Sequence, residues 1–267
     1  MRRTALVACA GLLLAAATAG PASAITNGSP DGDLHPSVGA IVADWSSASP
    51  GPDVTCSGTL IDARVFLTVA HCTTFLVARG HDIRVTFSPH YDEDAVAPTG
   101  LIAGTAVAHP LFGSGTSDPN DIAVVLLAES PGVPPAQLPG AGLLDQLQAD
   151  HALDDSTFTA VGYGETRADE TGGWHARVPR DGIRRHVSQQ AHALRPSWLV
   201  LTSNAATGDG GSCYGDSGGP HFFGGVDSTL MVSTTVKVDS TCRALDQTYR
   251  LDTLEARAFL SQFVDLP

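Results

Sequence analysis

Basic residues are scarce in this sequence, and their scarcity limits the partners that the protein could bind. The 267 residues include 15 Lys and Arg against 28 Asp and Glu, and Lys237 is the only lysine. The formal net charge at pH 7 is −13. A surface of this sign repels the phosphate backbone of nucleic acids. We therefore expect no nucleic-acid partner.

Long apolar runs are missing beyond the N-terminus, so no internal membrane span is predicted. The first residues match a secretory signal peptide, with Arg2 and Arg3, an uncharged apolar run over 6–19 and an A-x-A site at 22–24. A bilayer span needs about 20 apolar residues, which makes this run too short for an anchor. We predict a signal peptide over 1–24 and a secreted, extracellular domain over 25–267. Its net charge would be −13 − 2 = −15, with no membrane contact after removal of the signal.

Cysteine is uncommon, and zinc-binding spacings are absent. Of five cysteines, Cys9 lies in the predicted signal peptide, which leaves Cys56, Cys72, Cys213 and Cys242. An even number in a secreted chain indicates disulfides, and the simplest of the three pairings joins each cysteine to its nearest neighbour along the chain. Zinc is the alternative, but no C-x-x-C or H-E-x-x-H spacing occurs. The acidic stretch 91–95 could hold calcium, but without ordered ligand spacing it is interpreted as a solvated loop. We expect no metal and no cofactor.

Helical periodicity is also rare, whereas short apolar runs rich in β-branched residues recur between turn signals. The runs are 38–42, 59–61, 65–69, 83–87, 101–108 and 122–127, followed by 157–161, 198–202, 221–223, 230–236 and 248–251. This pattern predicts an all-β fold built from barrels, with the proline-rich stretch 131–140 as the connector between two of them. One helix is predicted near the C-terminus, where Asp252 and Glu255 could form a capping box, and it would pack on the second barrel.

The stretch Gly210–Pro220, GGSCYGDSGGP, places five glycines around Ser217. Clustered glycine indicates unusual backbone dihedrals or close backbone approach. If Ser217 is a nucleophile, it needs a base, usually histidine, and a carboxylate that orients the base. His71 is the best base because it ends the apolar run of FLTVAHC. Asp121 is the best carboxylate because it lies where a turn meets the apolar strand of DPNDIAVVLL.

The chain order His71, Asp121, Ser217 separates the hydrolase classes. An α/β-hydrolase needs the order Ser, acid, His, but the only histidine after Ser217 is His221, four residues on. The blocks LTVAHC, NDIAVVLL and GDSGGP together resemble the three motif blocks of the chymotrypsin/trypsin family of serine proteases, and the similarity covers essentially all of 25–267. It implies two perpendicular six-stranded antiparallel β-barrels at about 25–135 and 136–253, with a C-terminal helix at about 253–264 and the triad in the cleft between the barrels.

The resemblance also implies roles for the residues. Ser217 would attack the scissile carbonyl, His71 would accept its proton, and Asp121 would orient the imidazole. The backbone N–H groups of Gly215 and Ser217 would form the oxyanion hole.

Two further features follow from the same resemblance. Ser233 matches a serine that lies near the buried aspartate, and Ser233, Thr234 and Thr235 match the segment that pairs with substrate. A freed N-terminal aliphatic residue, here Ile25, would insert into the protein and pair with Asp216. Because no pro-segment separates position 24 from Ile25, we expect signal-peptide removal itself to give the active form.

The expected pocket for P1, the substrate residue before the scissile bond, contains no acidic side chain. Gly211 stands at its floor, where trypsin-like members carry an aspartate. Ser212 would line the pocket and Tyr214 its rim, while Thr235 and Gln247 would form the two walls. We therefore predict a preference for uncharged P1 residues.

Alternatives to this function remain open at the level of the sequence. Asp209, or Asp246 in a register shifted by one residue, could supply a negative charge and select Arg or Lys at P1. An esterase would use the same triad, and an inactive binding protein could share the fold. The leading hypothesis is a monomeric serine endopeptidase that acts on protein or peptide substrates and could meet protein inhibitors.

Overall fold

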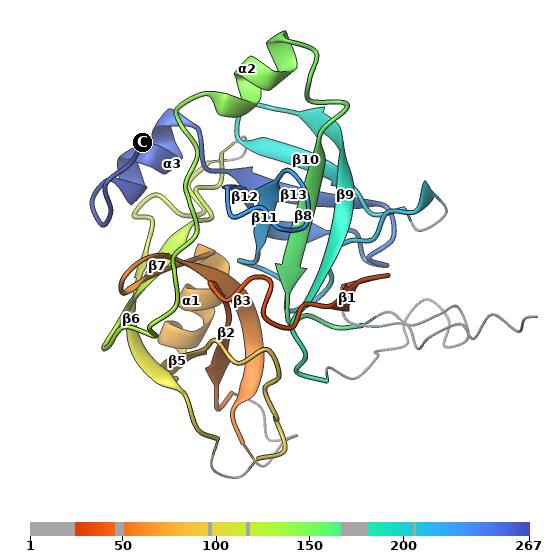
Figure 1. Ribbon diagram of the computed structural model, residues 1–267. Helices are drawn as coiled ribbons and strands as arrows, with labels where there is room; N and C mark the ends of the chain where they lie inside the picture. The colour runs from red at the N-terminus through yellow and green to blue at the C-terminus, as the bar shows by residue number, and fades with distance from the viewer. Residues whose placement is uncertain (1–24, 46–50, 96–97, 116–117, 167–180, 205–206) are drawn as a thin grey trace, which may run out of the picture.

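Six strands of the first half of the chain close into a β-barrel (Figure 1). The computed structural model describes residues 25–45, 51–95, 98–115, 118–166, 181–204 and 207–267. The strands are β2 (Val38–Ala43), β3 (Asp53–Asp62), β4 (Val65–Thr68), β5 (Ile83–Thr86), β6 (Ile102–Ala108) and β7 (Ala123–Leu127). They pair antiparallel in the closed order β2-β3-β4-β7-β6-β5. Residues of the predicted signal peptide lie outside the described part of the chain.

Six strands of the second half form another closed antiparallel barrel. They are β8 (Thr157–Gly162), β9 (Arg185–Leu194), β10 (Trp198–Thr202), β11 (Pro220–Phe223), β12 (Met231–Val238) and β13 (Leu245–Arg250). Their order is β9-β10-β13-β12-β11-β8, and β8 pairs back with β9. The short strand β1 (Ser29–Pro30) pairs antiparallel with the first two residues of β9. The prediction of an all-β fold with two six-stranded barrels is confirmed, although the first residues of the domain pair with the second barrel.

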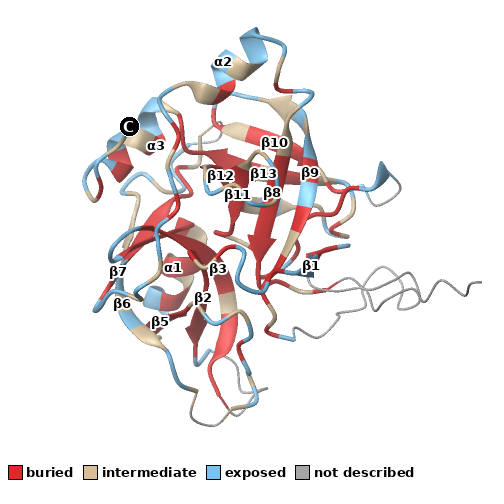
Figure 2. Cartoon of the chain, in the orientation of Figure 1, coloured by how far each residue is buried: buried red, intermediate tan, exposed pale blue. Residues whose placement is uncertain are grey.

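The hydrophobic core continues from one barrel into the other. One cluster of buried residues includes Leu67 and Val124 of the first barrel together with Phe222 and Tyr249 of the second. Figure 2 shows buried residues concentrated in the strands of both barrels, while α2 and many connecting segments carry exposed ones. The shared core holds the two barrels against each other, so side chains from both can meet along one seam.

Three helices occur in the described residues: α1 (Ala70–Ala78), α2 (Leu143–Ala149) and α3 (Leu254–Leu260). The C-terminal helix was predicted, but its cap differs. Thr253 is the N-cap and accepts from the Ala256 N–H, whereas the Asp252 carboxylate accepts from the Leu144 N–H and from Arg250. The helix also contacts more than the second barrel, because the Phe259 ring lies 5.1 Å from that of His109.

No helix in the described residues is both long and apolar enough to span a lipid bilayer.

Candidate active site

His71 and Asp121 meet in the first barrel through two hydrogen bonds. His71 is the second residue of α1, just after β4, and Asp121 precedes β7, the strand that pairs with β4. The imidazole Nδ1 lies 2.8 Å from one carboxylate oxygen, and the His71 backbone N–H donates to the other at 2.9 Å. The Asp121 side chain is 7% exposed and that of His71 is 37% exposed. The buried carboxylate therefore fixes the orientation of the imidazole ring, which stays partly exposed to solvent.

Ser217 is tied to the same region by contacts that cross the seam. Its carbonyl accepts from the N–H of Ser57 in β3 at 2.9 Å. The residue before Ser57 is Cys56, whose disulfide partner is Cys72, directly after His71. In the described residues no hydrogen bond joins the side chains of His71 and Ser217, and such bonds are often long or poorly aligned in enzymes without bound substrate. The fold thus brings the loop of the second barrel beside the histidine of the first.

The backbone around Ser217 has dihedrals that favour glycine. Gly215 has φ +100° and Gly218 has φ +86°. A Cβ on Gly218 would lie 2.2 Å from the Thr68 hydroxyl oxygen and 2.3 Å from the Ser57 carbonyl oxygen. In the described part of the chain, the N–H groups of Gly215 and Ser217 donate to no protein acceptor. These two donors are therefore available to a developing negative charge.

Asp216 points into the interior of the protein. It is 1% exposed, and its carboxylate accepts from the N–H groups of Gly164 at 2.7 Å and Cys213 at 2.8 Å. A Cβ on Gly162 would lie 2.1 Å from this carboxylate, which explains the glycine there. The disulfide Cys213–Cys242 closes the same loop, so both predicted disulfides are confirmed.

Ile25 is inserted into the second barrel. It is fully buried and clusters with Ala160 and Val187. The next residue, Thr26, exchanges two backbone hydrogen bonds with Gly211, at 2.9 and 3.2 Å. The start of the predicted mature chain thus lies against the loop that leads to Ser217.

Three of the predicted pocket residues, Gly211, Ser212 and Thr235, are buried. Gly211 faces Ser203, whose hydroxyl oxygen would be 2.1 Å from an added Cβ. The hydroxyls of Ser212 and Thr235 are 3.2 Å apart, and both residues are buried. Tyr214 is 49% exposed, which suits a residue at the rim.

Ser233 is fully buried, and in the described residues no hydrogen bond joins its hydroxyl to Asp121. Its hydroxyl accepts from Thr248 inside the second barrel. Burial and then the charge of Asp118 raise the pKa of the buried Tyr249 strongly, and Asp121 adds to this. The register of β12 against β13 places Ser233 opposite Arg250, and this register cannot be read from a local motif.

The segment Ser233–Thr235 also lacks a free backbone edge for substrate. Ser233 and Thr234 pair with β11 on one side and β13 on the other. Thr235 donates to the Gly219 carbonyl and accepts from the Gly218 N–H. Beyond Thr235, β12 pairs with β13 alone among the described strands, so a free edge begins only at residue 236.

Asp246 lies directly behind the predicted pocket, whereas Gln247 is only half-buried. Asp246 is fully buried and accepts from the Ser212 N–H at 2.8 Å, the Gln189 amide at 2.7 Å and the Ser203 hydroxyl at 3.0 Å. The sequence indicated neither Gln189 nor Ser203. No local signal could have done so, because their partner is more than 40 residues away along the chain.

His221 faces the same carboxylate from β11. Its Nε2 is 3.7 Å from an Asp246 oxygen, and neither ring nitrogen has a hydrogen-bond partner in the described residues. The second candidate acid, Asp209, is held instead by the hydroxyls of Thr202 and Thr207.

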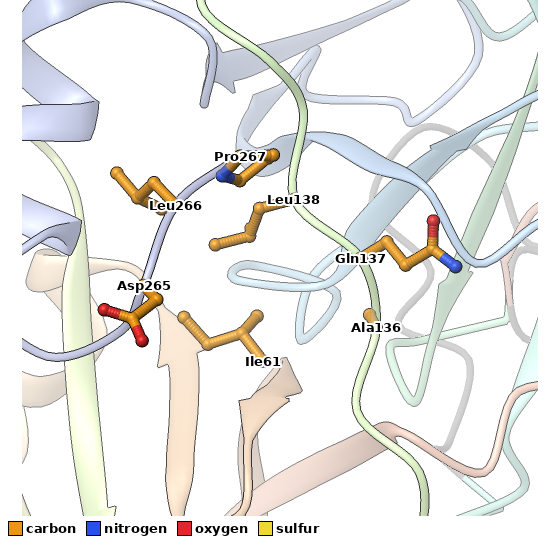
Figure 3. A pocket seen from close by; sticks show the side chains of 7 residues that line it. All are labelled: Ile61, Ala136, Gln137, Leu138, Asp265, Leu266 and Pro267. Atoms are coloured by element: carbon orange, nitrogen blue, oxygen red, sulfur yellow. The ribbon is translucent and has the colours of Figure 1, made fainter.

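Two other groups of residues in the described structure have features of ligand sites. The sulfurs of Cys56 and Cys72 lie near His71 with a spacing that suits a metal, but they are bonded to each other and offer no thiolate. A pocket of about 460 Å³ lies between the first barrel, the connector and the C-terminal segment (Figure 3). Its walls are Ile61, Ala136, Gln137, Leu138, Asp265, Leu266 and Pro267.

Comparison with known proteins agrees with this geometry. The trypsin family model matches residues 38–244, more than half of the chain. The chain therefore belongs to the trypsin family of serine proteases. It is 29% identical over 177 residues to the vitellin-degrading protease of Bombyx mori, covering 62% of this chain and 61% of that protein. It is 26% identical over 221 residues to trypsin eta of Drosophila erecta, covering 78% of each.

Coverage of these relatives is uneven. The chain spans 61% of the Bombyx mori protein and 49% of a CLIP domain-containing serine protease of Anopheles gambiae. The structure of HL collagenase is similar in fold, with a TM-score of 0.61 at 17% identity, covering 88% of this chain and 95% of that one.

Proposed function

We propose that this protein is a secreted serine endopeptidase that uses Ser217, His71 and Asp121 as its triad. The observation that carries the proposal is the His71–Asp121 pair, which two hydrogen bonds hold together beside the loop of Ser217. The carboxylate holds a proton on Nδ1, which leaves Nε2 free to accept the Ser217 proton. Ser217 then attacks the peptide carbonyl, and His71 returns the proton to the leaving amine. The N–H groups of Gly215 and Ser217 would stabilise the oxyanion.

Active-site labelling tests this proposal. The wild type should react with a fluorophosphonate and hydrolyse peptides, whereas Ser217→Ala should lose labelling and more than about 10⁴-fold in kcat. Ser188→Ala, which removes an exposed serine of β9, is the matched control. Asp121→Asn should lower kcat by about 10⁴-fold, because it favours the wrong histidine tautomer. Labelling of Ser217→Ala at the wild-type rate would contradict the assignment, and an unlabelled wild type would indicate a binding protein.

The P1 preference that we propose is for uncharged side chains. Gly211 brings no charge to the pocket floor, and the Asp246 carboxylate already accepts from three donors. Arg or Lys at P1 is the second candidate, because the Asp246 oxygen lies only 2.8 Å from the Ser212 N–H. A P1-diverse peptide library separates the two. Dominant cleavage after Arg or Lys that falls at least 100-fold in Asp246→Asn would establish the second.

We further propose that cleavage before Ile25 produces the active form. The freed ammonium would pair with Asp216 and order the loop of Ser217. Burial of Ile25 and the inward direction of Asp216 support this proposal. N-terminal sequencing of active secreted protein should start at Ile25, and a start further upstream would contradict it.

A further inference from the structure

Ser57 lies fully buried where the two barrels meet, and all its polar groups are engaged. It belongs to β3 of the first barrel. Its hydroxyl donates to the Gly215 carbonyl at 3.0 Å and accepts from the Tyr163 N–H at 3.0 Å. Its backbone N–H donates to the Ser217 carbonyl at 2.9 Å, and its carbonyl accepts from the Thr68 hydroxyl at 2.9 Å. One side chain thus connects the first barrel, the end of β8 and the loop of Ser217.

The bond to Gly215 has a specific consequence for the loop. At φ +100°, Gly215 lies in a region that glycine enters readily, but glycine can also leave it at small cost. The Gly215–Asp216 peptide is fixed at both ends, because its carbonyl accepts from Ser57 and its N–H donates to the Cys213 carbonyl. The Gly215 N–H, which must face the substrate carbonyl, belongs to the preceding peptide, whose Tyr214 carbonyl accepts from the Glu165 N–H at 2.7 Å. Without the Ser57 hydroxyl, the peptide on the other side of Gly215 keeps only its bond to Cys213, so the backbone at this glycine is held on one side less firmly.

We propose that Ser57 is a positioning residue that keeps the Gly215 N–H aimed at the oxyanion. This inference rests on the proposed endopeptidase function. It assigns Ser57 no contact with substrate. Ser57 acts through the glycine, so its loss should weaken binding of the transition state while leaving ground-state binding unchanged.

The variant Ser57→Ala tests this role against a matched control. Thr59→Val changes a residue on the same face of β3, equally buried, whose hydroxyl has no hydrogen-bond partner in the described residues. We expect kcat of Ser57→Ala to fall about 10- to 100-fold, below the roughly 10²–10³-fold cost of losing an oxyanion donor outright. KM should stay within about twofold. Affinity for a peptide boronate, a mimic of the tetrahedral intermediate, should fall by the same factor as kcat/KM. Thr59→Val should keep the kcat and boronate affinity of the wild type.

The possible outcomes separate failure of this inference from failure of the proposed endopeptidase function. If Ser57→Ala keeps kcat and boronate affinity within about threefold of the wild type, the positioning role is wrong even when its Tm falls. If the wild type fails to label with fluorophosphonate, the proposed function fails first. Should Ser57→Ala not fold, Ser57→Cys keeps the side-chain volume with a weaker donor. It should then show an intermediate loss of kcat at unchanged KM, and full wild-type kcat would overturn the proposal.

Discussion

Replacing Arg184 with methionine should deprive the buried Asp31 carboxylate of its arginine partner where the two barrels meet. The Arg184 side chain is 1% exposed, and its Nε donates to Asp31 at 2.8 Å. Its other nitrogens donate to the carbonyls of Val38 at 2.9 Å and Gly32 at 2.6 Å. Removing one partner of such a pair typically costs about 3–5 kcal/mol. Since domains of this kind are stable by only about 5–15 kcal/mol, a large part of the stability would be lost.

The neighbouring arginine supplies the control. Arg185 pairs with Asp181 at 2.6 Å, but the Asp181 side chain is 42% exposed. Water can solvate that carboxylate after Arg185→Met, so the cost should be about 1 kcal/mol or less. Urea unfolding of both variants at one pH measures the difference in free energy of unfolding. Equal losses for the two arginines would refute the argument from burial.

The same pair should influence stability in acid. Burial acts to raise the pKa of the Asp31 carboxyl, but the hydrogen bond and charge of His35, followed by those of Arg184, hold that pKa below its usual value of 3.8. A lowered folded pKa adds stability above the unfolded pKa, and this stability is lost as the pH falls through the folded pKa. Without Arg184 the folded pKa rises, so acid unfolding of Arg184→Met should begin at a higher pH than in the wild type.

Three further outcomes are expected. Gly162→Ala would force its Cβ against Asp216, so the rate of fluorophosphonate labelling should fall at a temperature where the variant is still folded. Labelling at the wild-type rate would contradict this. Replacing Cys213 and Cys242 together by serine should lower the free energy of unfolding by about 2–4 kcal/mol, measured by denaturation without reductant. Burial raises the pKa of Tyr163 to about 12. Stability should therefore fall between pH 10 and about 12, as the unfolded tyrosine loses its proton first, and Tyr163→Phe should make that fall shallower.

Much of the fold could be predicted because most strands are short, apolar and bounded by turn residues. Strand β9 (Arg185–Leu194) was not predicted because its sequence, RHVSQQAHAL, is largely polar. Its Gln189 is nevertheless buried, since Asp246 from β13 accepts its amide. Helix α1 was not predicted either, for a different reason. Its residues include two threonines and a valine, which favour strands over helices. In both elements, bonds between residues far apart in the sequence compensate for a weak local preference for the observed secondary structure.

The sequence by itself determined the candidate catalytic residues and the class of fold. The blocks around His71, Asp121 and Ser217 are local in sequence. Their chemistry requires those residue types, and their order along the chain matches that of the chymotrypsin template. The cysteine count and spacing likewise favoured the disulfide pairing that the structure has.

Only the tertiary structure decided how strands align across the barrels. It placed Ser233 inside the second barrel, brought Asp246 behind Ser212, and joined Ser57 to Gly215. Each of these contacts joins residues that no local motif connects. Strand register depends on packing and hydrogen bonding summed over a whole sheet, and a shift of one residue turns every side chain to the opposite face.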